Sequence, residues 1–266
     1  MMLSPKKVLT IAGSDSGGAA GLQADLKTLT ALGVYGMSAV TAVTAQNSVS
    51  VNDVTWMSAP FLQAQLDAVL SDYGADGVKT GFLGRPPLII TTSACLQRHR
   101  PPHIVIDPVL VNHRGESMFP AVITDLYRIY LLPLAAVLTP NLPEAALLTG
   151  RPLPPPDDLA AIQAMAQTLQ RFGADTVLIK GGHDRHKMVD VLFDGLAFTL
   201  LAADRVDTPN THGAGDTLSA AICAYLAKGA DVKTAVRQAH AFTHNAIKHA
   251  QTWRLGTGHG PLAHFI

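Results

Sequence analysis

Cysteine is scarce in this chain of 266 residues: Cys95 and Cys223 are its two cysteines, and both lie among apolar residues without metal-ligand spacing. This argues against a disulfide framework and favours buried thiols in a reducing compartment. Long apolar runs are also missing. The run after Lys6 and Lys7 is too short for a signal peptide, and no stretch approaches the ~18 residues of a membrane span. We therefore expect a cytoplasmic protein without membrane contact.

An excess of charge of either sign is lacking too. The chain has 20 basic and 20 acidic residues, and its formal net charge is zero. Because proteins that bind nucleic acid normally show a basic excess, this balance argues against a nucleic-acid partner. Hydrophobic residues, in contrast, make up 48% of the chain, enough for a sizeable core at this length.

Short apolar runs recur along the chain and predict the strands of a parallel sheet. They are nearly continuous rather than alternating, as in strands buried on both faces, and they cover residues 8–13, 37–46, 76–83, 103–111, 135–141 and 176–182. Helix-length segments separate them. Their apolar faces begin at Leu22, Phe61 and Leu218, and Gly33 and Gly229 end the first and the third. This alternation predicts a doubly wound α/β sheet with ligands beyond the carboxyl ends of its strands.

Two segments depart from the alternation. Residues 187–207 contain two β-rich runs around Asp194 and Gly195, which predicts a β-hairpin. The proline-rich residues 151–158 predict a surface loop whose Asp157 or Asp158 caps a helix. Since no repeat and no long linker divides the chain, we expect a single domain over residues 1–266.

The two common nucleotide-binding glycine motifs, G-x-G-x-x-G and G-x-x-x-x-G-K-[ST], are absent, which excludes a Rossmann fingerprint and a Walker loop. The stretch NTHGAGDTLSAA (210–221) instead places Gly213, Ala214 and Gly215 before a helix. Glycines let N–H groups converge at the positive end of the helix, and such an anion hole suits a phosphoryl group in transfer. Asp216 either caps this helix or acts as a base. A carboxylate beside an anion hole is electrostatically awkward unless it accepts a proton, which favours the base.

A second glycine-rich stretch, SDSGGAAGLQAD (14–25), follows the first predicted strand. It is either a plain strand-to-helix turn or the wall of a small-molecule pocket, in which Asp15 and Asp25 supply polar groups beside exposed backbone.

Polar residues end three further strands. Asn141 and Glu144 have the spacing of a capping box. Alternatively, they gather with Asp107 around Mg²⁺, since hard oxygen ligands and retained waters suit that ion. Lys180, before two glycines, is placed to reach a phosphate, although a lone lysine at a strand end is commonly just solvated.

These motifs, together with TAQN (44–47), VKTGFL (78–83), DPV (107–109) and KGGH (180–183), closely resemble the hydroxymethylpyrimidine and phosphomethylpyrimidine kinases of thiamine biosynthesis, in the ribokinase-like superfamily. The resemblance runs from about residue 7 to GTGHGPLAHF (256–265). It implies a three-layer α/β/α sandwich that phosphorylates 4-amino-5-hydroxymethyl-2-methylpyrimidine with ATP and Mg²⁺, and then the monophosphate. It also favours a homodimer.

The resemblance assigns roles to the matching residues. Gln46 would read the ring nitrogen and the exocyclic amine, because its amide offers a donor and an acceptor side by side. The same pocket would be lined by Gly13, Ala20, Asp25, Phe82 and Val109. Asp216 would be the catalytic base beside the anion hole of Gly213, Ala214 and Gly215. The nucleotide would contact Lys180, Gly182, Asn141 and Thr211, and the metal Asp107 and Glu144.

The chain also departs from the family pattern. Many members have cysteine at the position of Asp216, and the frequent A-K-S-G after D-P-V-M reads Asn112-His113-Arg114-Gly115 here, while the methionine of K-x-G-M is Phe82. These changes concern substrate range, and pyridoxal kinase is the alternative function. Nicotinamide-nucleotide hydrate dehydratases share the fold and a Gly-x-Gly-Asp loop, but residues 14–25 and 44–47 count against a lyase. A non-enzymatic pyrimidine sensor would lack the base or the anion hole, and this chain keeps both.

Overall fold

The computed structural model describes residues 4–112, 114–184 and 187–265. Within these ranges the strands are β1 (Lys7–Asp15), β2 (Tyr35–Gln46), β3 (Val51–Trp56), β4 (Gly77–Thr80), β5 (Ile104–Ile106), β6 (Val137–Leu138), β7 (Val177–Asp184), β8 (Lys187–Phe193) and β9 (Phe198–Asp204). The α-helices are α1 (Gly21–Ala31), α2 (Ala59–Asp72), α3 (Pro86–His99), α4 (Ala121–Leu126), α5 (Leu142–Thr149), α6 (Leu159–Arg171), α7 (Ala214–Ala227) and α8 (Val232–His249). A π-helical turn, Tyr127–Leu131, and a 3-10 turn, Leu132–Leu134, follow α4.

The strands of the described residues form one sheet in the order β3-β2-β1-β4-β5-β6-β7-β8-β9. Six adjacent strands are mutually parallel, namely β2, β1, β4, β5, β6 and β7, whereas β3, at one edge, runs antiparallel to β2. Toward the other edge, β8 pairs antiparallel with β7 on one side and with β9 on the other. Because β2 and β4 lie on opposite sides of β1, the chain reverses its winding there, and such a point opens a crevice at the carboxyl ends of the strands. The predicted doubly wound sheet is confirmed.

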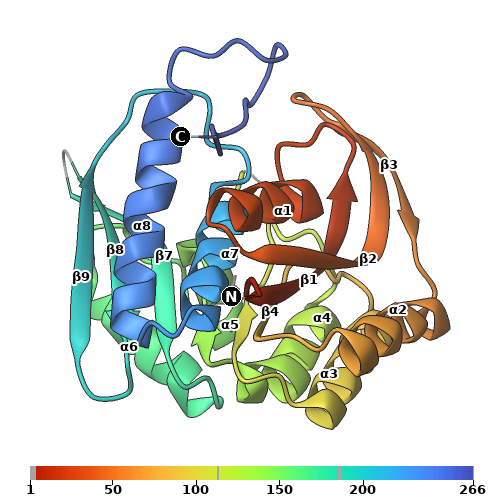
Figure 1. The fold of residues 1–266 in the computed structure, drawn as a ribbon. Coiled ribbons are helices and arrows are strands. Elements are labelled where there is room, and N and C mark those ends of the chain that lie inside the picture. The colour runs from red at the N-terminus through yellow and green to blue at the C-terminus, as the bar shows by residue number, and fades with distance from the viewer. Residues whose placement is uncertain (1–3, 113, 185–186, 266) are drawn as a thin grey trace.

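Both faces of the sheet are covered by helices. Helices α1, α7 and α8 lie on one face and α2 to α6 on the other (Figure 1). Neighbouring strand residues point into different cores: Val8 packs with α7 and α8, while Leu9 packs with α2 and α3. Since consecutive side chains of a strand alternate between faces, a nearly continuous apolar run is what two covered faces require. The three-layer α/β/α sandwich follows.

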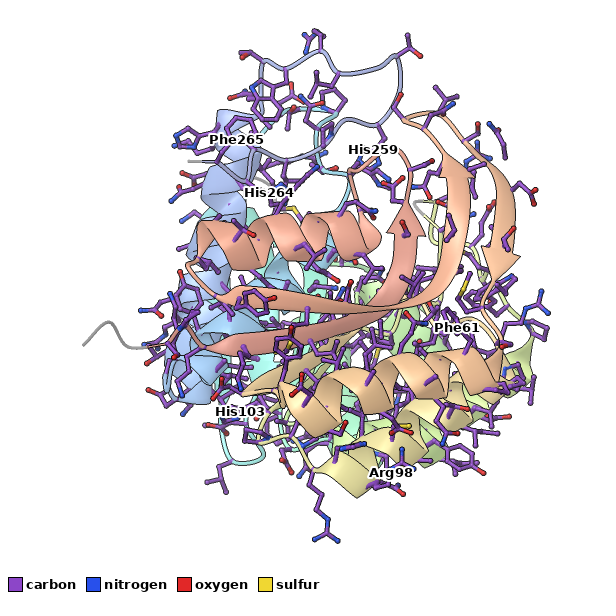
Figure 2. All side chains as sticks on the ribbon, turned by 45° about the vertical axis from the view of Figure 1, so that its right-hand side comes forward. Phe61, Arg98, His103, His259, His264 and Phe265 are labelled. Atoms are coloured by element: carbon purple, nitrogen blue, oxygen red, sulfur yellow. The ribbon has the colours of Figure 1, made fainter. Side chains whose placement is uncertain are left out.

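The structure confirms the hairpin and the helix cap that were predicted from short stretches of the sequence. Strands β8 and β9 form the hairpin predicted for residues 187–207, and the Asp194 carboxylate accepts from the N–H groups of Leu196 and Ala197 in its turn. Asp158 caps α6 through the N–H of Ala161. Phe61 is a correction. It was expected on the buried face of α2 but is 56% exposed (Figure 2), because Leu62, Leu66 and Leu70 carry the buried face.

None of the helices in the described ranges combines the length and the apolar character that crossing a membrane would take.

Candidate active site

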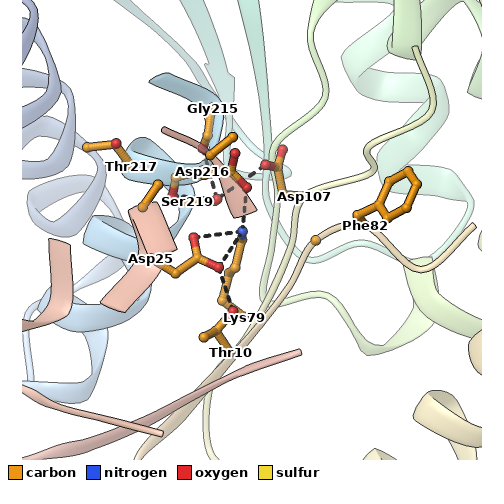
Figure 3. A network of polar contacts seen from close by, with 12 residues as sticks. Thr10, Asp25, Lys79, Phe82, Asp107, Gly215, Asp216, Thr217 and Ser219 are labelled. Atoms are coloured by element: carbon orange, nitrogen blue, oxygen red, sulfur yellow. Dashed lines mark hydrogen bonds and ion pairs between the residues drawn. The ribbon is translucent and has the colours of Figure 1, made fainter. Parts of the chain in front are cut away.

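A fully buried lysine lies at the centre of the site. Lys79, on β4, places its Nζ 2.8 Å from Oδ1 and 2.9 Å from Oδ2 of Asp25, and 3.0 Å from Oδ1 of Asp216 (Figure 3). Asp25 also accepts from the hydroxyl of Thr10 at 2.5 Å. The side chains of Lys79 and Asp25 have no exposed surface, whereas that of Asp216 is 16% exposed. Of the three charged groups, Asp216 is the one that a ligand can reach.

The charges of this network support one another. Burial alone would lower the pKa of Lys79, but the carboxylates of Asp25 and Asp216 outweigh burial and raise it. Burial would likewise raise the pKa of Asp216, yet Lys79 holds it below its ordinary value. The pKa of Asp25 rises to about 7 because burial outweighs the pull of Lys79. At neutral pH Lys79 is therefore charged and Asp216 is ionised, free to accept a proton from a ligand.

A second ion pair lies beside the first. Lys180 donates from Nζ to Oδ1 of Asp107 at 2.9 Å, and the hydroxyls of Thr139 and Ser219 donate to the same carboxylate at 3.1 and 3.3 Å. Burial alone would lower the pKa of Lys180, but Asp107 and Glu144 raise it. Lys180 was expected to end its strand, but it lies in the middle of β7, because the strand continues through both glycines to Asp184. A charged lysine beside the first turn of α7 can attract a phosphate.

The first turn of α7 lies beside Lys180. Gly213 is the N-cap with a φ of +85°, and a Cβ there would collide with the carbonyl oxygen of Ala19, so another residue would push the two loops apart. A Cβ on Gly215 would lie 3.2 Å from Nζ of Lys180. The N–H of Ala214 donates to the carbonyl of Thr211. The N–H of Ala214 is therefore engaged within the loop, whereas the backbone of Gly215 lies close to Lys180. The anion hole stays a prediction.

Asp216 is not the cap of α7. The N-cap position belongs to Gly213 without a side-chain hydrogen bond, and the Asp216 carboxylate bonds to Lys79 across the sheet rather than to its own helix turn. Of the two roles that the sequence left open, the structure removes capping. The catalytic role stays a prediction.

Asn141 and Glu144 form the capping box that the spacing predicted. The Asn141 side chain accepts from the N–H of Glu144, and the Glu144 carboxylate accepts from the N–H of Asn141, both at 2.9 Å. The same carboxylate accepts from the N–H of Leu110, which follows β5. Burial raises the pKa of Glu144 to about 7, although Lys180 opposes this. The box therefore also holds a carboxylate within the electrostatic reach of Lys180 and Asp107.

The loop between β1 and α1 is organised by Asp15. Its carboxylate accepts from the N–H groups of Gly17, Ala19 and Ala20 at 2.8 to 2.9 Å, so it shapes the loop from within. Ala20 remains half-buried at the start of α1. Asp25 is a correction: it was expected to line the substrate pocket, but its side chain has no exposed surface, and Lys79 and Thr10 engage both of its oxygens. It acts on the site through Lys79.

An aromatic cluster adjoins the loop. Phe82 stacks on Trp56 with ring centroids 5.1 Å apart and contacts Phe119 at 5.6 Å. In Figure 3 its ring points away from Lys79. A Cβ on Gly13 would lie 3.0 Å from the Phe82 ring, so this buried glycine makes room for it. Val109 is half-buried just after β5. The structure thus brings Gly13 and Phe82 together, and their role in lining the substrate pocket stays a prediction.

Gln46 ends β2 and faces the loop that precedes α7. Its Nε2 lies 3.0 Å from Nε2 of His212, and its Oε1 lies 3.2 Å from the hydroxyl of Thr44. Thr211 is exposed, and its hydroxyl lies 2.7 Å from Nε2 of His259 in the C-terminal segment. The structure therefore places Gln46 beside the loop that leads through Gly213 into α7.

The remaining residues singled out in the sequence lie around β7 and after β5. Gly182 pairs with Val189 of β8. The Asn141 and Lys180 backbones form an isolated bridge, which joins the capping box to the middle of β7. Asn112 accepts from the N–H groups of Arg114 and Glu116 and so forms a turn, whereas His113 lies outside the described residues.

The sequence did not predict three residues as parts of the site: Lys79, His212 and Trp56. Lys79 lies within a run that was taken as a buried strand, and a charged residue there requires an opposite charge nearby. That requirement was the available signal, although it does not name the partner. His212 and Trp56 gave no local signal, because their partners, Gln46 and Phe82, are distant in the sequence.

The chain is similar to known kinases in sequence and in fold. The model of the family described as phosphomethylpyrimidine kinase matches residues 15–263. The hydroxymethylpyrimidine/phosphomethylpyrimidine kinase of Rhizobium meliloti is 47% identical over 97% of this chain and 96% of its own. The thiamine biosynthesis bifunctional protein ThiED of Geobacter sulfurreducens is 44% identical over 97% of this chain and 52% of its own. The Staphylococcus aureus pyridoxal kinase, solved with AMP-PCP and pyridoxal, matches at a TM-score of 0.90 with 38% identity, over 99% of this chain and 94% of that one.

Proposed function

This chain belongs to the phosphomethylpyrimidine kinase family, and from that premise we propose that it transfers the γ-phosphoryl group of ATP to the hydroxymethyl oxygen of 4-amino-5-hydroxymethyl-2-methylpyrimidine, and then phosphorylates the monophosphate. One observation carries the proposal. An ionised, partly exposed Asp216 in the first turn of α7 is held by Lys79 beside the Lys180–Asp107 pair.

The chemistry follows from these positions. Asp216 accepts the hydroxymethyl proton while the oxygen bonds to the γ-phosphorus and the bond to the β-phosphate oxygen breaks. Its lowered pKa makes it a weak base but keeps it ionised, and the alcohol becomes more acidic as the new bond forms. The N–H groups at the start of α7 and the Lys180 ammonium stabilise the negative charge of the phosphates. Gln46 orients the ring.

The residues also fit a Mg²⁺ ion that arrives with the nucleotide. Asp107 and Glu144 supply hard oxygens, whereas no group of three or more potential ligands occurs among the described residues. Mg²⁺ is commonly held by one or two carboxylates together with phosphates and water, so a larger group is not required. When bound, the ion neutralises phosphate charge. Asp107 and Glu144 are the residues that would hold it.

Steady-state kinetics with the hydroxymethylpyrimidine, its monophosphate and pyridoxal in parallel test the proposal. We expect the highest kcat/KM with the two pyrimidines. Pyridoxal is the second candidate acceptor, because a pyridoxal kinase shares this fold at a TM-score of 0.90. A preference for pyridoxal would replace the proposed substrate, and the absence of ATP-dependent phosphorylation of all three would end the kinase proposal.

Replacing Gln46 with alanine should raise the KM for the pyrimidine strongly and leave the KM for ATP nearly unchanged. The amide offers a donor and an acceptor to the ring, while Lys180 and the first turn of α7 face the nucleotide. The two KM values, measured under saturation of the other substrate, check this. If the pyrimidine KM of the variant equals that of the wild type, Gln46 does not read the ring.

We also propose that residues 1–266 form one domain that works as a homodimer. One sheet running through the described residues supports the single domain. The edge strand β3 and its turn expose Val49 at 65% and Val51 at 54%, and apolar residues on a sheet edge can pair with a second copy. Sedimentation analysis would give the oligomeric state.

A further inference from the structure

The orientation of the Gln46 amide depends on two neighbours. Thr44, on the same strand, approaches Oε1 at 3.2 Å, and His212 approaches Nε2 at 3.0 Å. Each neighbour uses one hydrogen-bonding position of the amide. One N–H and one lone pair of oxygen are then left for a ligand.

The same side-chain position accommodates the amide in two orientations. With the nitrogen toward His212, the ring accepts at Nε2, and a neutral His212 carries its proton on Nδ1. With the oxygen toward His212, Nε2 of the ring must carry a proton, and Thr44 must accept from the amide. Thr44 can do so because its hydroxyl also lies 3.1 Å from the carbonyl of Ser14, to which it can donate. The two orientations exchange the free donor and the free acceptor of Gln46.

We propose that His212 is a specificity-determining residue, which fixes the orientation of the Gln46 amide and so decides which donor–acceptor pattern the acceptor ring must have. The inference rests on the proposed role of Gln46 as the residue that reads the ring. His212 acts through Gln46 and is therefore a positioning residue.

His212 is itself held firmly. The backbone N–H of His212 donates to the carbonyl of Gly260 at 3.0 Å, and its ring faces that of His259 with centroids 5.1 Å apart. The backbone N–H of His259 in turn donates at 2.8 Å to the carbonyl of Ser48, which lies two residues after Gln46. Figure 2 shows His259 at the end of the molecule where β2 turns into β3. The C-terminal segment thus clamps His212 against the strand that carries Gln46.

His212 also joins two parts of the site, because the next residue is Gly213, the N-cap of α7. His212, which orients Gln46, is therefore directly bonded in the chain to the turn that would bind the transferred phosphate. A ring with the wrong pattern would meet Gln46 with two like groups, and unsatisfied polar groups in a closed site are costly.

Two acceptors with opposite patterns test the proposal. The 4-amino hydroxymethylpyrimidine presents an amine donor beside a ring-nitrogen acceptor, and its 4-oxo analogue presents a carbonyl acceptor beside a ring N–H donor. We expect the wild type to prefer the 4-amino compound. In His212→Phe, which keeps a ring against His259 but loses the hydrogen bond, the ratio of the two kcat/KM values should fall by about tenfold or more. The KM for the 4-amino compound should change more than kcat.

Two further variants separate this role from a structural one. Thr44→Val removes the other neighbour of the amide at similar volume and should lower the same ratio. In a Gln46→Ala background, His212→Phe should leave the ratio unchanged, because no amide remains to be oriented. An unchanged ratio in folded His212→Phe and Thr44→Val would overturn the inference, as would an equal loss of kcat with both acceptors. A wild type that neither binds nor phosphorylates a pyrimidine would overturn the proposed function and this inference together, whereas an active wild type with unaffected variants overturns this inference alone.

Discussion

Asp216→Asn should lower kcat by roughly 10²–10⁴-fold, the usual contribution of a positioned general base. Asparagine keeps the shape of the side chain and can still accept a hydrogen bond from Lys79, but it cannot take up the substrate proton. The dissociation constants for the pyrimidine and ATP should move much less, because the lost interaction belongs to the transition state. Single-turnover kinetics together with equilibrium binding of both substrates measure the two effects.

Asp231→Asn is a matched control for this prediction. Asp231 caps α8 through the N–H of Thr234, and asparagine caps a helix as well as aspartate does, so turnover should not change. Asp216→Cys extends the test. A thiol there should give partial activity that rises with pH as the thiolate forms, and the neighbouring Lys79 should hold the thiol pKa below its ordinary value. A folded Asp216→Asn enzyme with the chemical rate of the wild type would show that another group is the base.

Lys79→Met should destabilise the fold by about 3–5 kcal/mol, the range for breaking a buried ion pair by removing one partner. Asp25 would lose the cation that pairs with its buried carboxyl group, so its pKa would rise further, and Asp216 would lose the charge that holds its pKa down. Only the ionised base is active, so its rising pKa should shift the acid limb of the pH–rate profile to higher pH. Urea denaturation and the pH dependence of kcat measure the two effects.

A double variant separates stability from electrostatics. Lys79→Met with Asp25→Asn removes the second buried charge, and it should recover part of the stability while the acid limb stays at high pH. Lys233→Met is the matched control, since Lys233 pairs with Asp194 at the surface and exposed pairs contribute little. An unchanged pH–rate profile in Lys79→Met would refute the view that Lys79 sets the charge state of Asp216.

The elements of this fold could be predicted because they depend on short-range information. A strand between two helix layers must be apolar on both faces, so β1 and β7 are visible as continuous apolar runs. The Asn141–Glu144 capping box and the 187–207 hairpin are made by residues a few positions apart. The glycines before α7 and the carboxylate after them are likewise one continuous stretch.

The spacing of residues within an element does not reveal what lies across from it. Phe61 was placed on the buried face of α2 because it is apolar, yet the packing of the helix against β2 and α3 turns other residues inward. Asp25 was expected beside the substrate because it follows a glycine-rich turn, but the rotation of α1 directs it under the site toward Lys79.

The alternation of most strands and helices, and the glycine-rich stretch that leads into Asp216, can be recognised in the sequence alone. Their surroundings depend on the tertiary structure: Lys79 meets Asp216 across 137 residues, and Gln46 meets His212 across 166. The physical reason is that a helix or a strand is specified by neighbours in the chain. The partner of a buried charge or of an amide is instead specified by which helix or loop the fold packs against the strand that carries it, and no local pattern records that choice.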